Sequence, residues 1–328
     1  MLASPQHNGR REGQQGERVD TPNHAGHPFT VRPRGMCLGL TLFAALPASG
    51  QVPEWAELWR VVSVTLPGPA ALQHGPTATF WNPAAVNDGT GLGGGIEVLQ
   101  TPDVVSLSSV VVGVTQRLGH LALGVVAGRV SVADLVRTTT SPTSEAGDIP
   151  VFSQFAGAAF GGRVGAFSLG ALVRAHDAQF DTRSQGGLTL DLGIRATPVE
   201  RLSLGVSTRF VTPDRPGARV GEYYAGTEYR LKTASLWGAS ALITGRYGVA
   251  YQPTVGVEHG LSAGLGLEGR FRVDWGWVRE LGPVAASWRP VLGVEFRAGR
   301  YIITVARGAG LNDVGAAFRL GLIAGITQ

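Results

Sequence analysis

The chain has 328 residues, of which 48 are glycine and only 16% are charged. Its formal charge of +4 is small, and no run of basic residues is interleaved with aromatic ones, which argues against a nucleic-acid partner. A chain of this length can bury a large core in one or two domains.

The N-terminal sequence predicts an exported protein. Two arginines, Arg32 and Arg34, precede an apolar stretch at 36–46, and small residues follow it at 47–50. This order is that of a secretory signal peptide over residues 31–50, and the apolar stretch is too short to span a membrane as a helix.

The position of this signal has two consequences. Because a signal peptide stands at the start of a precursor, we interpret residues 1–30 as an upstream extension that is not part of the natural product, and we expect the mature chain to begin near Gln51. The only cysteine, Cys37, lies within the signal. The mature chain therefore offers neither a disulfide nor a thiolate metal ligand.

Residues 51–90 form a separate region ahead of the strands. Apolar residues over 52–64 predict one or two turns of amphipathic helix, with Pro53 suited to the first helical position. A loop rich in glycine and proline follows. No segment after the signal is apolar for long enough to form a transmembrane helix.

From residue 91 to the C-terminus, apolar and polar residues alternate, which is typical of β-strands. We predict fourteen strands, at 91–101, 104–117, 120–131, 151–163, 166–178, 187–196, 201–211, 220–231, 234–247, 259–269, 271–279, 286–298, 300–308 and 314–326.

The alternation is plainest in the hairpin at 187–210. Aliphatic residues alternate with polar ones from Leu188 to Ile194, and the second strand repeats this pattern from Leu202 to Phe210. One face is therefore aliphatic, and the other carries charge and glycine. A soluble sandwich would bury the aliphatic face, whereas a membrane barrel would turn it to lipid.

The lengths of the links favour the barrel. Short links are predicted around Gly119, Gly165, Thr197, Thr233, Gly269 and Gly299. Several of the intervening links are predicted to be long, at 132–150, 179–186, 212–219 and 248–258. Short periplasmic turns that alternate with long outer loops are typical of bacterial outer-membrane barrels.

The residues on the two faces also favour the barrel. Aromatic residues at strand ends are predicted to face outward in two belts, with Phe167, Phe271, Phe296 and Tyr301 near the short turns and Phe210, Trp277 and Trp288 near the long loops. The opposite face is predicted to line a lumen, and its charged residues include Arg174, Asp191, Arg195, Arg209, Arg272, Asp274, Glu295, Arg297 and Arg319. Glycines between these charges leave room for guanidinium groups, whereas an exposed strand would only lose stability from them.

These patterns predict an all-β fold, an antiparallel up-and-down transmembrane β-barrel over residues 91–328. A barrel of fourteen strands is too wide for its own side chains to fill. Residues 51–90 are therefore the available plug.

Five residues ahead of the first predicted strand carry a family resemblance. Phe80, Trp81, Asn82, Pro83 and Ala84 resemble the Phe-x-Asn-Pro-Ala signature of the outer-membrane fatty-acid transporter (FadL-like) superfamily, which includes the PorV-like proteins of type IX secretion systems. The resemblance implies a fourteen-stranded barrel whose N-terminal segment folds inward as a hatch that contains these five residues.

A second stretch resembles the PorV-like branch in particular. The run at 260–267, followed by 271–275, is similar to that branch's paired late strands. Two features depart from the family: Ala85 and Val86 stand where Gly-Leu is common, and the chain lacks a terminal aromatic residue.

The resemblance implies a protein of the bacterial outer membrane in contact with its lipid. In the transporter branch the partner is a hydrophobic small molecule, and in the PorV-like branch it is a secreted cargo protein. The alternatives are an outer-membrane hydrolase and a purely structural barrel.

Neither a catalytic site nor a metal site is predicted. The histidines after the signal lack metal-ligand spacing, and His176 with Asp177 lacks a positioned nucleophile, so we interpret that pair as the solvated start of a loop. Carboxylates in or beside the long links are interpreted as solvated, namely Asp134, Glu145, Asp148, Asp181, Asp214 and Glu222. No cofactor is predicted, and we expect a protein that is not an enzyme.

Overall fold

The structure is a computed structural model. It describes residues 54–60, 62–101, 106–135, 147–211, 221–231, 235–244, 248–262, 264–277, 287–309 and 316–325. The predicted upstream extension, the signal peptide and the expected mature start at Gln51 lie outside these ranges, as do the loop carboxylates Glu145 and Asp214.

Short helices precede the first strand. The helix predicted within 52–64 is present as α1 (Glu54–Arg60), and three 3-10 helices follow: η2 (Ala70–Leu72), η3 (Pro76–Phe80) and η4 (Pro83–Asn87). Proline begins η3 and η4, because its fixed φ and missing N–H suit a first helical turn. None of the described helices is long and apolar enough to cross a membrane. We call the described residues of 51–90 the N-terminal segment.

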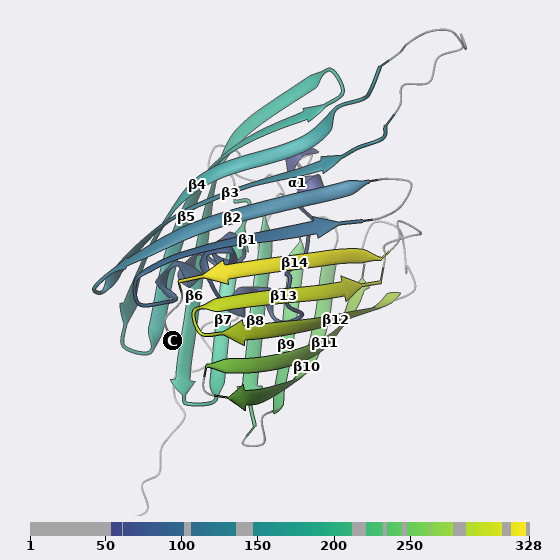
Figure 1. The fold of residues 1–328 in the computed structure, drawn as a ribbon. Helices are drawn as coiled ribbons and strands as arrows, with labels where there is room; N and C mark the ends of the chain where they lie inside the picture. The colour runs from purple at the N-terminus through teal and green to yellow at the C-terminus, as the bar shows by residue number, and fades with distance from the viewer. Residues whose placement is uncertain are drawn as a thin grey trace, which may run out of the picture. The chain divides into compact units, whose positions relative to one another are not determined.

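Fourteen antiparallel strands follow in the described part of the chain. They are β1 (Leu92–Gln100), β2 (Leu107–Leu118), β3 (Leu121–Val132), β4 (Val151–Val164), β5 (Phe167–Phe180), β6 (Arg183–Val199), β7 (Leu202–Arg209), β8 (Glu222–Arg230), β9 (Ser235–Thr244), β10 (Gly248–Ser262), β11 (Leu265–Trp277), β12 (Ser287–Ala298), β13 (Tyr301–Gly308) and β14 (Ala317–Ala324). Each strand pairs with its neighbours in sequence, and β14 pairs with β1, which closes the barrel (Figure 1). The predicted fourteen-stranded antiparallel barrel is confirmed.

The two faces of the barrel wall differ as the alternation predicts. On β6, Leu188, Leu192 and Ile194 are exposed, whereas Asp191 and Arg195 at the alternate positions are buried. Other strands repeat this pattern, with exposed Leu123, Val125, Val173, Leu204, Val206, Val255, Leu292, Val305, Leu320 and Leu322. Because successive side chains of a strand point to opposite faces, the outward surface is mainly aliphatic.

Outward aromatic residues accompany this aliphatic surface. Phe167 and Tyr301 are exposed where β5 and β13 begin, and Phe296 is exposed near the end of β12. Phe271 is also exposed, but it lies within β11 rather than beside a turn. The side chains of Trp277 and Trp288, predicted to face outward, are not among those that the structure describes.

The tenth and eleventh strands lie elsewhere than predicted. The loop predicted at 248–258 is wrong, because β10 begins at Gly248. Gly269, predicted as a short link, lies inside β11 and pairs with Val257 and Val294. Pro253 explains the wrong prediction, because proline has no N–H to donate and is therefore unusual inside a strand. The pairing of β10 with β11 accordingly skips residues 252–253.

Two predictions at the end of the barrel away from the short turns are also wrong. The loop predicted at 179–186 is a tight turn, in which Asp181 takes the left-handed φ of 56°. Phe210 was predicted to face outward, but it is fully buried. Its φ of 62° breaks the alternation after Arg209 and directs the ring inward, and its backbone N–H donates to Asp191 Oδ1 at 2.7 Å.

Candidate functional site in the barrel interior

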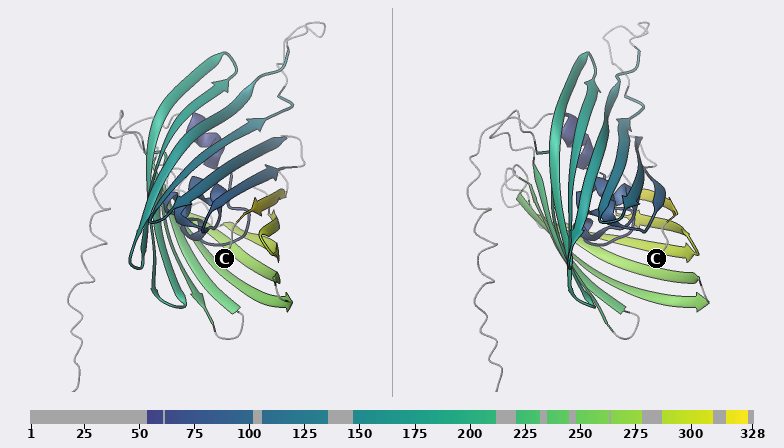
Figure 2. Two further views of the ribbon diagram at one scale, coloured as in Figure 1. Left: turned by 60° about the vertical axis from the view of Figure 1, so that its left-hand side comes forward. Right: turned by 90° about the vertical axis from the view of Figure 1, so that its left-hand side faces the viewer.

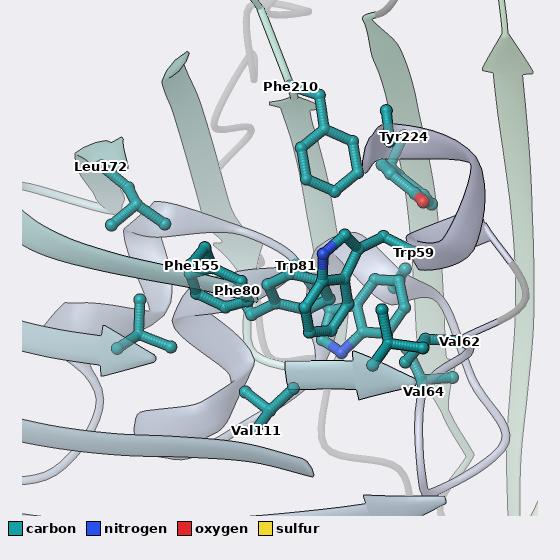
Figure 3. Close-up of a cluster of buried hydrophobic side chains, with 14 of the residues drawn as sticks. Trp59, Val62, Val64, Phe80, Trp81, Val111, Phe155, Leu172, Phe210 and Tyr224 are labelled. Carbon is teal, nitrogen blue, oxygen red and sulfur yellow. The ribbon is translucent and has the colours of Figure 1, made fainter. Parts of the chain in front are cut away.

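Six aromatic side chains gather in a buried cluster, and all six are labelled in Figure 3. We call Trp59, Phe80, Trp81, Phe155, Phe210 and Tyr224 the aromatic cluster. Phe80 is central, because its ring centroid lies 5.2 Å from those of Trp59 and Phe155, 5.0 Å from that of Trp81 and 6.4 Å from that of Phe210. Half of the cluster comes from the N-terminal segment and half from the wall, and Figure 2 shows the segment's helices within the curve of the strands.

The turn at Asn82 positions Phe80 and Trp81. The Asn82 side chain accepts a hydrogen bond from the backbone N–H of Ala84 at 2.9 Å and thereby caps η4. Its amide also donates to the carbonyl oxygen of Ala71 at 2.7 Å. The side chain therefore ties η4 to η2 while it is itself fully buried.

Glycines in the wall let this turn approach β5 and β6 closely. A Cβ on Gly193 would overlap the Asn82 side chain, and a Cβ on Gly170 would overlap the backbone of Pro83. All five residues of the resemblance, from Phe80 to Ala84, are buried in this region.

Two of the charged residues predicted for the lumen lie against the aromatic cluster. The guanidinium carbon of Arg174 is 4.7 Å from the ring centroid of Phe210 and 5.1 Å from that of Phe80. The guanidinium carbon of Arg209 is 4.4 Å from the Trp81 ring centroid and 4.8 Å from that of Phe80. At these distances the cations are attracted by the negative faces of the rings.

Each of these arginines has a buried carboxylate partner. Arg174 pairs with Asp191, and Arg209 Nε donates to Glu222 Oε2 at 2.7 Å. The Tyr224 hydroxyl donates to the same oxygen at 2.8 Å. The prediction that Glu222 is solvated is wrong, because it begins β8 on the inward face and is 1% exposed. Removal of one member would leave a buried, uncompensated charge.

Arg195 holds two parts of the N-terminal segment together. Its Nε donates to the carbonyl oxygen of Ala71 at 3.0 Å, and its Nη2 donates to the carbonyl oxygen of Gln73. Its Nη1 also lies 3.0 Å from Asp88 Oδ2. One side chain of β6 therefore contacts the residues on both sides of η3.

Other charges predicted for the lumen form an ion-pair network on the late strands. Arg297 contacts Glu258 at 2.8 Å, Glu268 at 2.6 Å and Glu295 at 2.7 Å. Arg270 shares Glu268 at 2.5 Å. Mutual pairing keeps these groups from being isolated charges in the interior.

The remaining predicted residues lie apart from this network. Arg272 is buried and pairs with the half-buried Asp274, and Arg319 is also buried. The structure thus distributes the nine predicted residues over several groups rather than one site.

A cavity of about 470 Å³ lies beside the network. It is lined by residues of both charge signs, including Asp88, Glu97, Arg117, Arg163, Arg230 and Arg297. The four arginines lie at or next to the ends of β2, β4, β8 and β12, which places the cavity toward the short turns.

Sequence reasoning missed several residues of the interior. The cluster positions of Trp59, Phe155 and Tyr224 could not be predicted from local sequence patterns, because their contacts join distant parts of the chain. The prediction that His176 is solvated is wrong: it is buried in β5, and its Nε2 lies 2.9 Å from Thr189 Oγ1. The sequence could have placed His176 correctly, because residues two positions apart on a strand share a face and Arg174 was predicted to point inward. Among the described residues, no group of three His, Cys, Asp or Glu side chains is placed to hold a metal ion.

These features define a closed antiparallel barrel with an aliphatic outside and a charged interior, which is the architecture of bacterial outer-membrane channels. The structure is similar to the toluene transporter TbuX of Ralstonia pickettii, with a TM-score of 0.52 and 11% identity, covering 80% of this chain and 97% of that chain. It is also similar to the toluene transporter TodX of Pseudomonas putida, with a TM-score of 0.51 and 10% identity, covering 85% and 98% of the two chains. The barrel fold that the resemblance implies is confirmed, and the chain shares it with these two transporters. No protein-family profile and no curated protein sequence matches the chain.

Proposed function

We propose that the protein is a non-catalytic channel of the bacterial outer membrane for hydrophobic small compounds. Its aliphatic outward face suits contact with membrane lipid, because lipid-facing residues of such barrels are apolar. Two proteins of the same fold are toluene transporters, which supports a small aromatic or similarly apolar compound as the substrate class.

The observation that carries this proposal is the aromatic cluster. A flat apolar compound can replace the contacts that Phe80 makes with Trp81 and Phe155, because aromatic rings accept edge and face contacts with one another. The cluster is closed in the structure, since Phe80 is 1% exposed. A passing compound therefore requires Phe80 and its neighbours to move.

Residues 51–90 are the element that moves in this proposal, and they act as a hatch. Asn82 and Arg195 attach the segment through hydrogen bonds and one ion pair. Each intramolecular hydrogen bond contributes roughly 0.5–1.5 kcal/mol net. Release of the segment also exposes its buried Trp59, Phe80 and Trp81, but it leaves the pairing of the strands in place.

The charged interior limits the apolar path to the surroundings of the aromatic cluster. Arg174 and Arg209 contact ring faces there, and their charges are compensated by Asp191 and Glu222. The cavity of about 470 Å³ toward the short turns has charged residues of both signs in its lining. An apolar compound that reaches this cavity gains little from staying, so release is favoured on that side.

Handling of secreted cargo is the second candidate function. It is favoured by the sequence at 260–267, which spans the turn between β10 and β11 and leaves Leu261 and Leu265 exposed at the rim. A soluble partner can reach a rim residue more easily than the interior. Leu261→Glu should weaken cargo attachment and leave small-molecule uptake unchanged, whereas the channel proposal needs no contact at this position.

Uptake of labelled toluene by whole cells tests the channel proposal. Cells that lack their own channels for aromatic compounds are compared with and without this protein, at limiting toluene concentration. We expect uptake several-fold faster with the protein and no change in the uptake of arabinose, a polar solute. Equal toluene uptake with and without the folded protein would contradict the proposal.

A further inference from the structure

We propose that a hollow on the outward face of β2–β5 binds one membrane phospholipid whose headgroup carries both a phosphate and an amine. These four strands lie next to one another in the wall (Figure 1), and the hollow has a volume of about 490 Å³. The inference goes beyond the proposed function, because it concerns the lipid-facing surface and not the path through the interior. We call this feature the outward hollow, and its floor and one of its ends consist of Ala127, Ala156, Ala175, Arg129, Gln154 and Asp177.

Three alanines form the floor of the outward hollow. Ala127, Ala156 and Ala175 stand opposite one another on β3, β4 and β5. The same row continues to the exposed side chains of Val112 on β2 and Leu188 on β6. Adjacent strands lie about 4.8 Å apart, so the floor is about 10 Å wide from β3 to β5. Because methyl groups project less than the larger side chains on either side, this stretch of the wall is concave.

A row of polar side chains closes the end of the floor that lies away from the short turns. Arg129, Gln154 and Asp177 are paired in register, and each lies two residues from one of the alanines on its own strand. Arg129 Nη1 donates to Gln154 Oε1 at 3.4 Å, and Gln154 Nε2 donates to Asp177 Oδ2 at 2.9 Å. The row is therefore one connected group, with a positive charge at one end and a negative charge at the other.

This row marks the level at which the outward face changes from apolar to polar. Toward the short turns, the outward residues of the same strands are aliphatic, as at the exposed Val125 and Val173. Beyond the row, the hydroxyls of Ser108 and Ser131 lie 3.2 Å apart and form a hydrogen bond between β2 and β3. The apolar band of a membrane barrel ends where the hydrocarbon ends. The polar row thus lies at the depth of lipid headgroups, and the alanine floor lies at the depth of the acyl chains.

The two charges select the headgroup. The Arg129 guanidinium suits a phosphate, because its planar fork forms charge-assisted hydrogen bonds with phosphate oxygens. Asp177 at the other end of the row attracts an ammonium group and repels a second anion. A phosphoethanolamine headgroup carries both charges on one short, flexible chain, so it can engage Arg129 and Asp177 together. A purely anionic headgroup gains only the contact with Arg129.

The shape of the outward hollow favours a lipid over a second copy of the chain. A second copy would present the same concave floor at Ala156, and two facing hollows would leave unfilled space between them. Atoms that line a void lose their dispersion contacts, so such an interface would be poorly packed. A flexible acyl chain can instead follow the floor and fill it.

Lipid retention by the full-length folded protein tests this site. The protein is reconstituted into vesicles of equal parts phosphatidylethanolamine and phosphatidylglycerol and extracted in mild detergent, and native mass spectrometry counts the lipids that stay bound. We expect one phosphatidylethanolamine per chain, in about fivefold excess over phosphatidylglycerol, the upper range for one exposed ion pair. Equal retention of the two lipids by the wild type, or an excess of phosphatidylglycerol, would overturn the inference.

Three variants assign the retained lipid to the outward hollow. Asp177→Asn removes the attraction for the amine and should abolish the excess of phosphatidylethanolamine. Ala156→Leu fills the floor without changing a charge and should lower retention of both lipids several-fold. Arg307→Gln is the matched control, because Arg307 is an exposed arginine on the outward face of β13 that contacts the Phe318 ring as Arg129 contacts the Phe152 ring. It lies outside the hollow, so its loss should leave retention unchanged.

Heat-modifiable migration on gels verifies that each variant is folded. An unchanged excess in Asp177→Asn would overturn the inference, and so would unchanged retention in Ala156→Leu. If Ala156→Leu does not fold, Asp177→Asn decides alone, since its side chain is exposed and leaves the floor as it is. Wild-type dimers cross-linked through β3–β5 in the same vesicles, with no retained lipid, would assign the hollow to a second copy and overturn the inference as well.

Discussion

Asn82 occupies the space that Gly193 leaves on the inward face of β6. A Cβ at Gly193 would overlap Asn82 Oδ1 and lie 2.9 Å from Pro83 Cδ. The Asn82 side chain also bonds to Ala84 and Ala71, so it cannot turn away without losing those contacts. The closed position of the N-terminal segment therefore requires a residue without a Cβ at position 193 of the wall.

Gly193→Ala should loosen the N-terminal segment and raise the steady ion conductance of the barrel in planar bilayers several-fold. The added methyl group collides with Asn82, whereas β6 itself accepts alanine as well as glycine. Gly269→Ala is the matched control, because a Cβ there has nothing within 4 Å. Equal conductance for Gly193→Ala and the wild type would show that this contact does not hold the segment closed.

Arg195→Met should expose the N-terminal segment to proteolysis. The substitution keeps an unbranched apolar side chain and removes the bonds to Ala71, Gln73 and Asp88. We expect chymotrypsin to cleave within 62–90 at least several-fold faster, with the strands intact. Arg183→Met, at an exposed position where β6 begins, should be cleaved at the wild-type rate. Protection in both variants would contradict a clamp at Arg195.

Phe80→Ala should destabilise the protein by about 3–5 kcal/mol, the usual cost of truncating a buried aromatic ring. Urea unfolding followed by gel migration measures this change. The same variant should admit toluene faster, since the centre of the aromatic cluster is then empty. Phe160→Ala removes an equal ring from the outward face, where Phe160 is 52% exposed, and it should change neither property by a comparable amount. Equal effects at the two positions would contradict the central role of Phe80.

Arg209→Met should cost about 3–5 kcal/mol, because it leaves Glu222 buried without its main partner. The double variant Arg209→Met with Glu222→Leu should be more stable than Arg209→Met alone, since the buried carboxylate that loses Arg209 is removed as well, although Arg60 then loses its 3.5 Å contact with Glu222. Urea unfolding of both variants measures the difference. A double variant less stable than the single one would mean that Glu222 is not held by this pair.

The alternation of aliphatic and polar residues was enough to predict the wall. Leu188, Leu192 and Ile194 face outward as predicted, because a paired strand has no freedom to turn one side chain to the other face. The prediction failed for Phe210, because its own left-handed backbone conformation just after β7 turns the side chain inward. The start of β10 was also missed for a local reason. Pro253 interrupts the pairing with β11 but not the pairing with β9, so the strand continues through it.

The interior was predictable only in part. Parity was enough to place Arg174 and Arg209 on the buried face, but their aromatic surroundings come from residues distant in sequence. Trp59, for example, donates its indole N–H to Ser153 Oγ at 3.0 Å, across 94 positions of the chain. No local pattern in the sequence carries such a contact, and only the closure of the barrel brings it about.

Toluene uptake by a variant with a locked N-terminal segment tests the central claim most directly. A Cβ at Gly95 would lie 3.3 Å from Thr77 Cγ2, so the two side chains are neighbours, and Thr77→Cys with Gly95→Cys is the pair to join by oxidation. Whole cells that carry the oxidised double variant should take up toluene no faster than cells without the protein, and reductant should restore rapid uptake while leaving the wild type unaffected. Rapid uptake through a fully oxidised, folded variant would contradict passage by movement of residues 51–90.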